Sequence, residues 1–222
     1  MATARTTSGP RKRGQLDRDG ILDAATRLAA GGEQITFRAL GAALGSDPTA
    51  VYRHFRDKDE LVRAVFDRLQ VGILERIDTS GTWREQLVEA SMLTWQVCAD
   101  HPSVGIEARA MITGGPGELG SVEMLLERFL SAGLERTEAV RFYAVFASYL
   151  LSVASSVAAY RLNGHREGLL DGTWLGDVGP VDPARYPAVA SVRAELAALR
   201  DPEVFMMGVE MILDAAEAAA RP

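Results

Sequence analysis

The chain of 222 residues is longer than one average compact domain and shorter than two, so we expect one large unit or two small ones. With 47% hydrophobic and 24% charged residues, its composition is that of a globular protein and excludes intrinsic disorder over most of its length. The single cysteine, Cys98, excludes an intrachain disulfide, and no signal-peptide pattern opens the sequence. These features predict a reducing, cytoplasmic environment.

The net charge of −6 is unevenly distributed along the chain. Residues 1–70 carry a net charge of +3, whereas residues 71–222 carry −9. A mildly basic N-terminal part followed by an acidic remainder is typical of a nucleic-acid-binding head joined to a body with another role.

The first 14 residues form a basic tail containing Arg5, Arg11, Lys12 and Arg13, flanked by Gly, Pro and Ser. Such a tail either follows the DNA backbone or minor groove as an N-terminal arm, or serves only as a flexible, solubilising segment. The residues favour neither interpretation.

Apolar residues then recur at helical spacing almost everywhere, which predicts an all-α protein. We expect a three-helix head over residues 15–60, a linking helix over about 58–79 and a larger helical domain over 80–222. The first helix should run from Leu16 to Ala30. A second should be capped by Thr36 and end at Gly45, and a third should begin at Asp47 and Pro48 and end near Phe55.

The larger domain should contain six further helices, because Gly and Pro clusters separate its apolar runs. These are expected at Trp83–His101, Pro102–Ile112, Glu118–Ala132, Thr137–Asn163, Ala188–Leu199 and Pro202–Ala219. Residues 164–187, with five glycines and three prolines, predict a long mobile loop.

The strongest motif is TFRALGAALGSDPTAVYRHFRDK, residues 36–58. A helix-turn-helix needs small residues where its two short helices touch and a turn residue that tolerates positive φ. Gly41 and its alanine neighbours provide the contact, and Gly45 provides the turn. The third helix is short and rich in hydrogen-bond donors, as a major-groove reader requires.

This stretch, with LDRDGILDAATRLAA before it and DELVRAV after it, resembles the DNA-binding domain of the TetR family of transcriptional repressors. A second resemblance, to the tetracycline-repressor type of ligand-binding body, continues through HPSV, SAGLERTEAVRFYAVFASYLLSVA and YPAVASVRAELAAL. The resemblance implies a homodimer that binds a palindromic operator in double-stranded DNA and leaves it when a small-molecule effector binds.

The resemblance also implies roles for single residues of the head. Arg38 would reach a base edge, where its guanidinium can pair with guanine. The other positions that meet the groove are Pro48, Thr49, Tyr52 and His54. The positions that hold phosphates are Thr36, Tyr52, Arg53 and Lys58. Two residues depart from the family pattern, because Ala50 replaces a hydroxyl-bearing residue and Pro48 replaces a polar base reader; the operator sequence therefore cannot be carried over.

Residues 142–160 contain no charge, and that length is enough to cross a bilayer. Their serines and tyrosines favour a helix buried in protein instead. Small residues repeat every fourth position along one side, at Ala144, Ser148, Ser152 and Ser156. The resemblance implies that this helix and the last helix form the dimer interface, the last helix contributing Phe205, Val209 and Ile212.

A ligand pocket is expected beside the helix Trp83–His101, which is apolar almost all round and therefore interior. The candidate ligand-binding residues are Met92, Thr94, Trp95, Arg109, Phe146 and Tyr149. Arg109 would pair with an anionic ligand or form a plain salt bridge. Glu107 and Arg109 stand near Ala108, where the tetracycline-type pocket has a histidine for a drug-bound magnesium, so we expect neither a metal nor a cofactor.

Two other classes of function remain open. A helical dimer that carries a ligand without binding DNA fits the second half of the sequence. The segment GPGELG matches the dinucleotide fingerprint through Gly115, Gly117 and Gly120, but that motif must follow a buried strand in a βαβ unit. The scattered histidines and the absence of a nucleophile–base pattern predict no metal site and no catalysis.

Overall fold

The computed structural model describes residues 16–163 and 179–220, and in these residues the protein is helical, without a β-strand. The predicted basic tail and residues 164–178 of the predicted loop lie outside the described residues. The elements are α1 (Arg18–Ala30), α2 (Phe37–Leu44), η1 (Pro48–Arg53), α3 (Lys58–Leu74), α4 (Trp83–Asp100), α5 (Pro102–Gly105), η2 (Ala108–Ala110), α6 (Pro116–Ser131), α7 (Arg136–Leu162), α8 (Pro187–Ser191), α9 (Arg193–Ala198) and α10 (Asp201–Ala220). The predicted all-α class is confirmed.

The head begins each of its helices with a side-chain cap, as the sequence predicted for the second and third. The hydroxyl of Thr36 accepts a hydrogen bond from the backbone N–H of Ala39 at 3.0 Å, which satisfies one unpaired donor of α2. Gly45 ends α2 in the left-handed conformation with φ 59°. This residue turns the chain sharply into η1.

The third helix of the head differs from the prediction, because Pro48–Arg53 form a 3₁₀ helix rather than an α-helix. Its bonds join residues three apart, as from the N–H of His54 to the carbonyl of Val51 at 2.9 Å. Only six residues lie between the N-cap residue Asp47 and the C-cap residue His54. A segment this short is held by the burial of Val51 and Phe55 rather than by its own helical hydrogen bonds.

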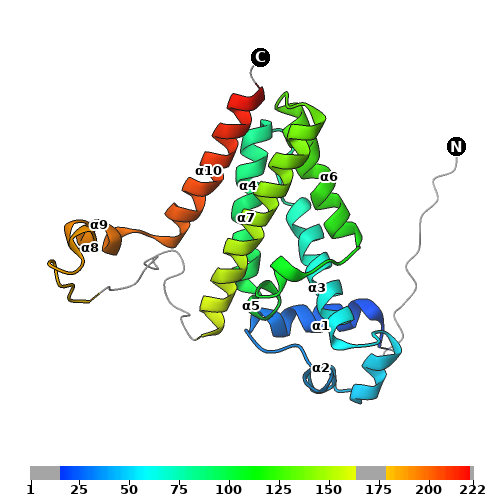
Figure 1. The fold of residues 1–222 in the computed structure, drawn as a ribbon. Coiled ribbons are helices and arrows are strands. Elements are labelled where there is room, and N and C mark those ends of the chain that lie inside the picture. Colours follow the sequence, from blue (N-terminus) through cyan, green and yellow to red (C-terminus); the bar gives the residue numbers. More distant parts are fainter. Residues whose placement is uncertain (1–15, 164–178, 221–222) are drawn as a thin grey trace, which may run out of the picture.

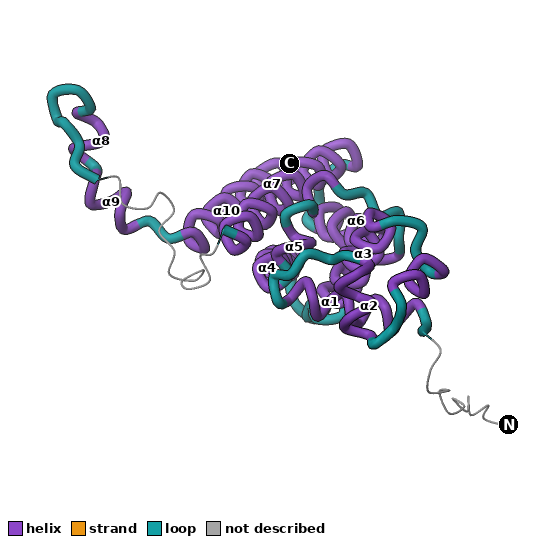
Figure 2. The backbone as a smooth tube through the Cα atoms, turned by 90° about the horizontal axis from the view of Figure 1, so that it is seen from below, coloured by secondary structure: helices purple, strands orange, loops and turns teal. Residues whose placement is uncertain are grey.

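The long helix α3 leaves the head and enters the body, where it packs against α4 and α6 (Figure 1). The other long helix, α7, packs against α4, α5, α6 and α10. Arg84 of α4 forms ion pairs with Glu210 and Asp214 of α10, which join the last helix to the body. Both views of the backbone show α8 and α9 projecting away from the body (Figures 1 and 2).

Two predicted helices are interrupted. The segment Pro102–Ile112 contains only the short α5 and η2, because Gly105 weakens helix propagation between the buried Val104 and Ala108. The segment Ala188–Leu199 breaks at Val192 into α8 and α9. No residue of α8 or α9 is buried, and short helices without packing are marginal in water.

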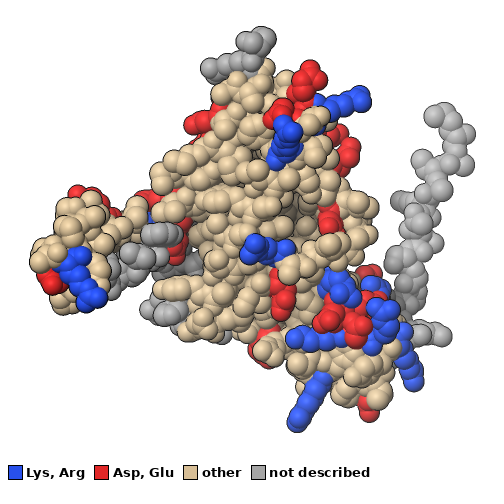
Figure 3. Space-filling model, viewed as in Figure 1, with Lys and Arg blue, Asp and Glu red and all other residues tan. Residues whose placement is uncertain are grey.

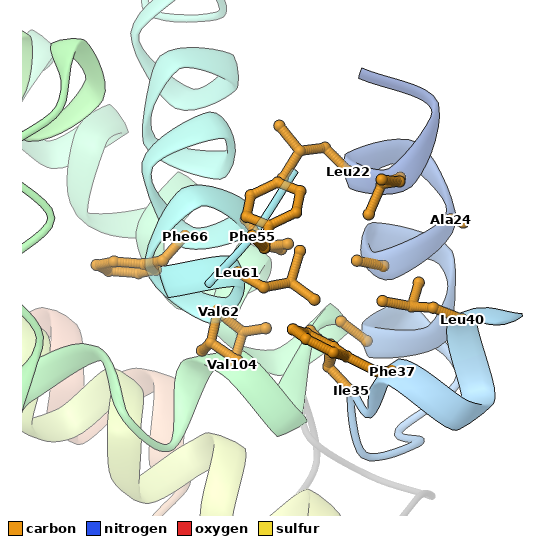
Figure 4. Close-up of a cluster of buried hydrophobic side chains, with 14 of the residues drawn as sticks. Leu22, Ala24, Ile35, Phe37, Leu40, Phe55, Leu61, Val62, Phe66 and Val104 are labelled. Carbon is orange, nitrogen blue, oxygen red and sulfur yellow. The ribbon is translucent and has the colours of Figure 1, made fainter. Parts of the chain in front are cut away.

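The core of the head continues into the body without a gap. Ile21, Leu40, Val51 and Leu61 are fully buried around Phe55, and Val104 of α5 packs into the same cluster (Figure 4). The head therefore rests directly on the body as well as being joined to it through α3.

The left-handed turn at Gly45 yields a test of the head. A Cβ at this position would meet no atom within 4 Å, so the penalty for Gly45→Ala is purely conformational. We expect the free energy of unfolding to fall by about 1–2 kcal/mol. Asn tolerates this conformation better, so Gly45→Asn should lose less. Chemical denaturation at one fixed protein concentration measures both, and equal losses would contradict the argument.

Candidate DNA-binding face and ligand cavity

The outer surface of the head is formed by α2, η1 and the start of α3. The side chains of Arg38, Thr49, Tyr52, Arg53 and Lys58 are exposed there, and those of Thr36, Pro48 and His54 are half-buried. Figure 3 shows Lys and Arg side chains projecting at this end of the molecule. The structure therefore places all the predicted DNA-contacting residues on one end of the molecule.

Close packing holds α2 against η1. A Cβ on Gly41 would lie 2.9 Å from the carbonyl oxygen of Ser46 and 3.0 Å from a ring carbon of Pro48, so only glycine allows this approach. The ring of Tyr52 remains 60% exposed, yet its centroid lies 4.3 Å from that of Phe37 in an edge-on contact. Tyr52 is thus supported from one side and open on the other.

Both ends of η1 are fixed by charged side chains. Asp47 accepts hydrogen bonds from the hydroxyl of Thr49 at 2.6 Å and from its N–H at 2.8 Å, and these bonds lower the pKa of Asp47. At the other end, Arg18 donates to the carbonyl of His54 at 3.1 Å and lies 4.3 Å above the ring of Phe55. The orientation of η1 is set by these contacts before any DNA arrives.

A cavity of about 110 Å³ lies in the body between α3, α4, α6 and α7. Among the predicted ligand-binding residues, Thr94 lines it. The others lie elsewhere: Met92 is at the surface, Arg109 is exposed on η2, and Phe146 is fully buried against Phe129. The predicted set therefore does not form one site.

Trp95 and Tyr149 line a different, more open hollow between α7 and α10. The hydroxyl of Tyr149 donates to the carbonyl of Phe205 at 3.0 Å, and the Trp95 ring lies 4.7 Å from the Phe205 ring. Both aromatic residues therefore attach α10 to the body.

The predicted ligand-binding residues do not include the wall that α3 contributes to the cavity, which consists of Phe66, Gln70, Ile73 and Leu74. These positions follow the spacing i, i+4, i+7 and i+8, which places them on one face of the helix. The apolar spacing of α3 continues beyond the residues that pack in the core of the head. This continuation is the signal in the sequence that could have revealed the wall.

The glycines of the dinucleotide-like segment have a packing role in this structure. Gly115 caps α6 and Gly117 lies in its first turn, where a Cβ on either would overlap Asp67 of α3. The carboxylate of Asp67 accepts hydrogen bonds from the N–H groups of Gly117 at 3.0 Å and Glu118 at 3.1 Å, and from the hydroxyl of Thr113 at 2.9 Å. No strand precedes this segment in the described residues, so the βαβ context of a dinucleotide site is missing.

The small-residue strip on α7 faces outward. Ala144, Ser148 and Ser156 are exposed and Ser152 is half-buried. On α10 the predicted residues lie differently, because Phe205 and Val209 are buried in the core of the same protomer and Ile212 is half-buried. The large apolar side chains that α10 exposes are those of Met207 and Met211.

By length and composition, the helix α7 could cross a membrane. In its most apolar stretch of 18 residues, 28% is buried inside the protein. It packs against four other helices of the body, as a core helix of a globular protein does. In the described residues no group of His, Cys, Asp and Glu side chains comes together as a metal site would require.

The comparisons with known proteins agree with this architecture. Residues 21–65 match the family model "Bacterial regulatory proteins, tetR family", and residues 78–219 match "Tetracyclin repressor-like, C-terminal domain". The chain is 27% identical to the HTH-type transcriptional repressor DrrR1 of Streptomyces coeruleorubidus, over 96% of this chain and 81% of the relative.

Solved structures show the same fold. A transcriptional regulator of Streptomyces coelicolor A3(2) is 26% identical and superposes with a TM-score of 0.75, over 93% of this chain and 99% of the other. ActR of Streptomyces coelicolor, solved in complex with actinorhodin, is 19% identical with a TM-score of 0.74, over 93% of this chain and 99% of its own. With both halves of the chain matched, the protein belongs to the TetR family of bacterial regulatory proteins and is a DNA-binding regulator of transcription.

Proposed function

We propose that the protein is a repressor that binds a palindromic operator as a homodimer and leaves it when a small molecule occupies the body. The observation that carries this proposal is the continuity of α3. Its first turns pack in the core of the head through Leu61 and Val65, and its last turns form a wall of the cavity through Ile73 and Leu74. A change of tilt imposed at the cavity therefore reaches the recognition elements through one rigid helix.

Within the head, residues 15–60, we assign Arg38 to a base edge, with Pro48, Thr49, Tyr52 and His54 as its neighbours in the groove. Thr36, Arg53 and Lys58 hold phosphates together with Tyr52. The exposure of Arg38, Arg53 and Lys58 supports these roles, because none of them forms a salt bridge among those of the described residues. Their charges are available to DNA.

The proposed dimer uses the outer face of α7 and α10. Ala144, Ser148, Ser152 and Ser156 allow a second helix to approach closely, and Met207 and Met211 supply exposed apolar surface on α10. A two-fold axis through this face would give the dimer two heads, as binding to two half-sites about 34 Å apart on one side of the DNA requires. The projecting α8–α9 segment, with no buried residue of its own, supports a partner on the same side.

The effector is proposed to enter the cavity of the body, residues 80–222 with the end of α3. DrrR1 is named a repressor, and ActR has been solved with actinorhodin bound, which supports a ligand-controlled repressor here. The protein would act by binding rather than by catalysis, in the cytoplasm, where it meets DNA. Sequencing the genomic fragments that the purified protein retains tests the proposal directly, and retention of no fragment in dilute buffer would overturn it.

Replacing the proposed base reader tests the groove assignment. Arg38→Ala should weaken operator binding by about 1–3 kcal/mol for each half-site, because a bidentate guanine contact is lost. Arg76→Ala is the matched control, since this exposed arginine follows the far end of α3. Gel-shift titration, with dimer content checked by sedimentation, measures the effect. Undiminished affinity of Arg38→Ala would remove Arg38 from the site.

The proposed phosphate contact has a different signature. Lys58→Ala should weaken binding to operator and unrelated DNA alike and should flatten the log–log salt dependence by about one unit for each protomer bound. Binding measured at a series of salt concentrations gives this slope. A slope equal to that of the unaltered protein would show that Lys58 contacts no phosphate.

The dimer face is tested by adding bulk and charge to it. Ser148→Arg should prevent close approach of two α7 helices, so the protein should become monomeric and lose operator affinity. Ser80→Arg, in the exposed turn between α3 and α4, introduces the same side chain away from α7 and α10. Light scattering coupled to gel filtration measures the mass, and a dimeric Ser148→Arg variant would place the interface elsewhere.

A further inference from the structure

The wall of the body cavity is mostly apolar. Its larger side chains include Phe66, Ile73, Leu74, Val97, Met124 and Leu125. Apolar surface of this kind favours molecules that gain by leaving water. The volume of about 110 Å³ is smaller than the ~150 Å³ of an engineered apolar cavity that binds benzene. Without movement of its walls, the cavity therefore holds no molecule larger than about one aromatic ring.

The wall offers no positive charge to a ligand. No Lys, Arg or His is among its lining residues in the described part of the chain, and its one carboxylate belongs to Glu118. Burial raises the pKa of the Cys98 thiol to about 12, so that side chain is neutral as well. An anion placed here would lose its hydration without gaining a cationic partner, which is strongly unfavourable.

The carboxylate of Glu118 is already engaged at the edge of the cavity. One of its oxygens accepts hydrogen bonds from the backbone N–H groups of Thr113 and Gly114, each at 2.7 Å. Its charge is therefore directed to the loop before α6 rather than to the aliphatic wall. A buried cation would have to compete with these donors, so an uncharged molecule suits the cavity better.

One buried side-chain atom of the wall lacks a partner. The side-chain oxygen of Gln70 is buried and makes no hydrogen bond within the described residues. Two polar side chains of the wall have partners, because the hydroxyl of Thr94 donates to the carbonyl of Ala90 and that of Ser121 to the carbonyl of Gly117, each at 2.8 Å. A buried acceptor left unpaired costs free energy, and a ligand that donates to it recovers that cost.

We propose that the cavity binds an uncharged, mainly apolar molecule that donates one hydrogen bond, from a hydroxyl or N–H group, to the side-chain oxygen of Gln70. This inference rests on the proposed function only in taking the cavity as the effector site. It names the chemical class of the effector and places its polar contact on α3, the helix that carries the head.

Calorimetric titration of the purified full chain, without DNA, tests the class with three single-ring probes. p-Cresol carries a ring and a donor, toluene has the ring alone, and benzoate is the anion. We expect p-cresol to bind about tenfold more tightly than toluene, which is the worth of one hydrogen bond to an otherwise unpaired buried acceptor. Benzoate should show no measurable binding. Equal affinity for p-cresol and toluene, or tight binding of benzoate, would overturn the proposal.

Variants of Gln70 identify the atom responsible. Gln70→Met keeps the length of the side chain and removes its oxygen, so the preference for p-cresol over toluene should disappear while toluene binds at least as well. The control is Gln96→Met, an exposed position on α4 outside the cavity, which should keep the tenfold preference. Survival of the preference in Gln70→Met, or its loss in Gln96→Met, would contradict the assignment.

Thermal unfolding provides a second readout that does not depend on ligand. Removing an unpaired buried acceptor is neutral or stabilising, so Gln70→Met should unfold at a temperature no lower than the unaltered protein. A clearly lower unfolding temperature would show that the oxygen is paired in the folded protein, against the proposal. A protein that retains operator DNA but ignores all three probes would overturn the ligand class and leave the proposed function standing. Gln70-dependent binding of p-cresol by a protein that retains no DNA would overturn the proposed function and leave the ligand class standing.

Discussion

The contact between α3 and the start of α6 is the constraint on which the rest of the arrangement depends. Asp67, midway along α3, accepts hydrogen bonds from two backbone N–H groups in the first turn of α6 and from the hydroxyl of Thr113. A carboxylate is favourable at this end of a helix, because the unpaired N–H groups there carry partial positive charge. The contact positions α6 against the same helix that carries the head, and thereby sets the width of the cavity between them.

This contact also explains a sequence feature that points toward the wrong chemistry. The spacing of Gly115, Gly117 and Gly120 matches a phosphate-binding loop, in which glycine lets a backbone approach a ligand. Here the same property lets the backbone of α6 approach another helix, because a Cβ on Gly115 or Gly117 would overlap Asp67. Close approach is what the glycines provide in both cases, and the residues alone do not say what is approached. The surrounding elements decide, and in the described residues they are helices.

Local signals predicted the head well, whereas the cavity depended on information that a single sequence does not contain. The cap at Thr36 and the left-handed turn at Gly45 follow from the chemistry of the residues themselves. The 3₁₀ geometry of η1 does not, since it is imposed by the burial of Val51 and Phe55 in a tertiary core. On α4 and α7, apolar side chains surround most of the helix, so periodicity cannot tell which face meets a cavity. Trp95 and Phe146 are therefore predicted from the sequence as ligand contacts, whereas in the structure they pack against α10 and Phe129.

The size of the cavity bears on how binding and release are linked. A molecule that fills about 110 Å³ without moving the walls favours the present position of α3 over positions that would change its contacts, so it does not drive α3 to a new one. A molecule that separates α6 from α3 acts against the hydrogen bonds of Asp67, which, being made to a charged group, contribute about 1.5–3 kcal/mol each. Apolar burial of ~25 cal/mol per Å² offsets one such bond with roughly 60–120 Å² of newly covered surface. In the proposed mechanism, release therefore requires a ligand that covers additional wall as the helices separate, and the proposed contact to Gln70 would select which molecules begin that process.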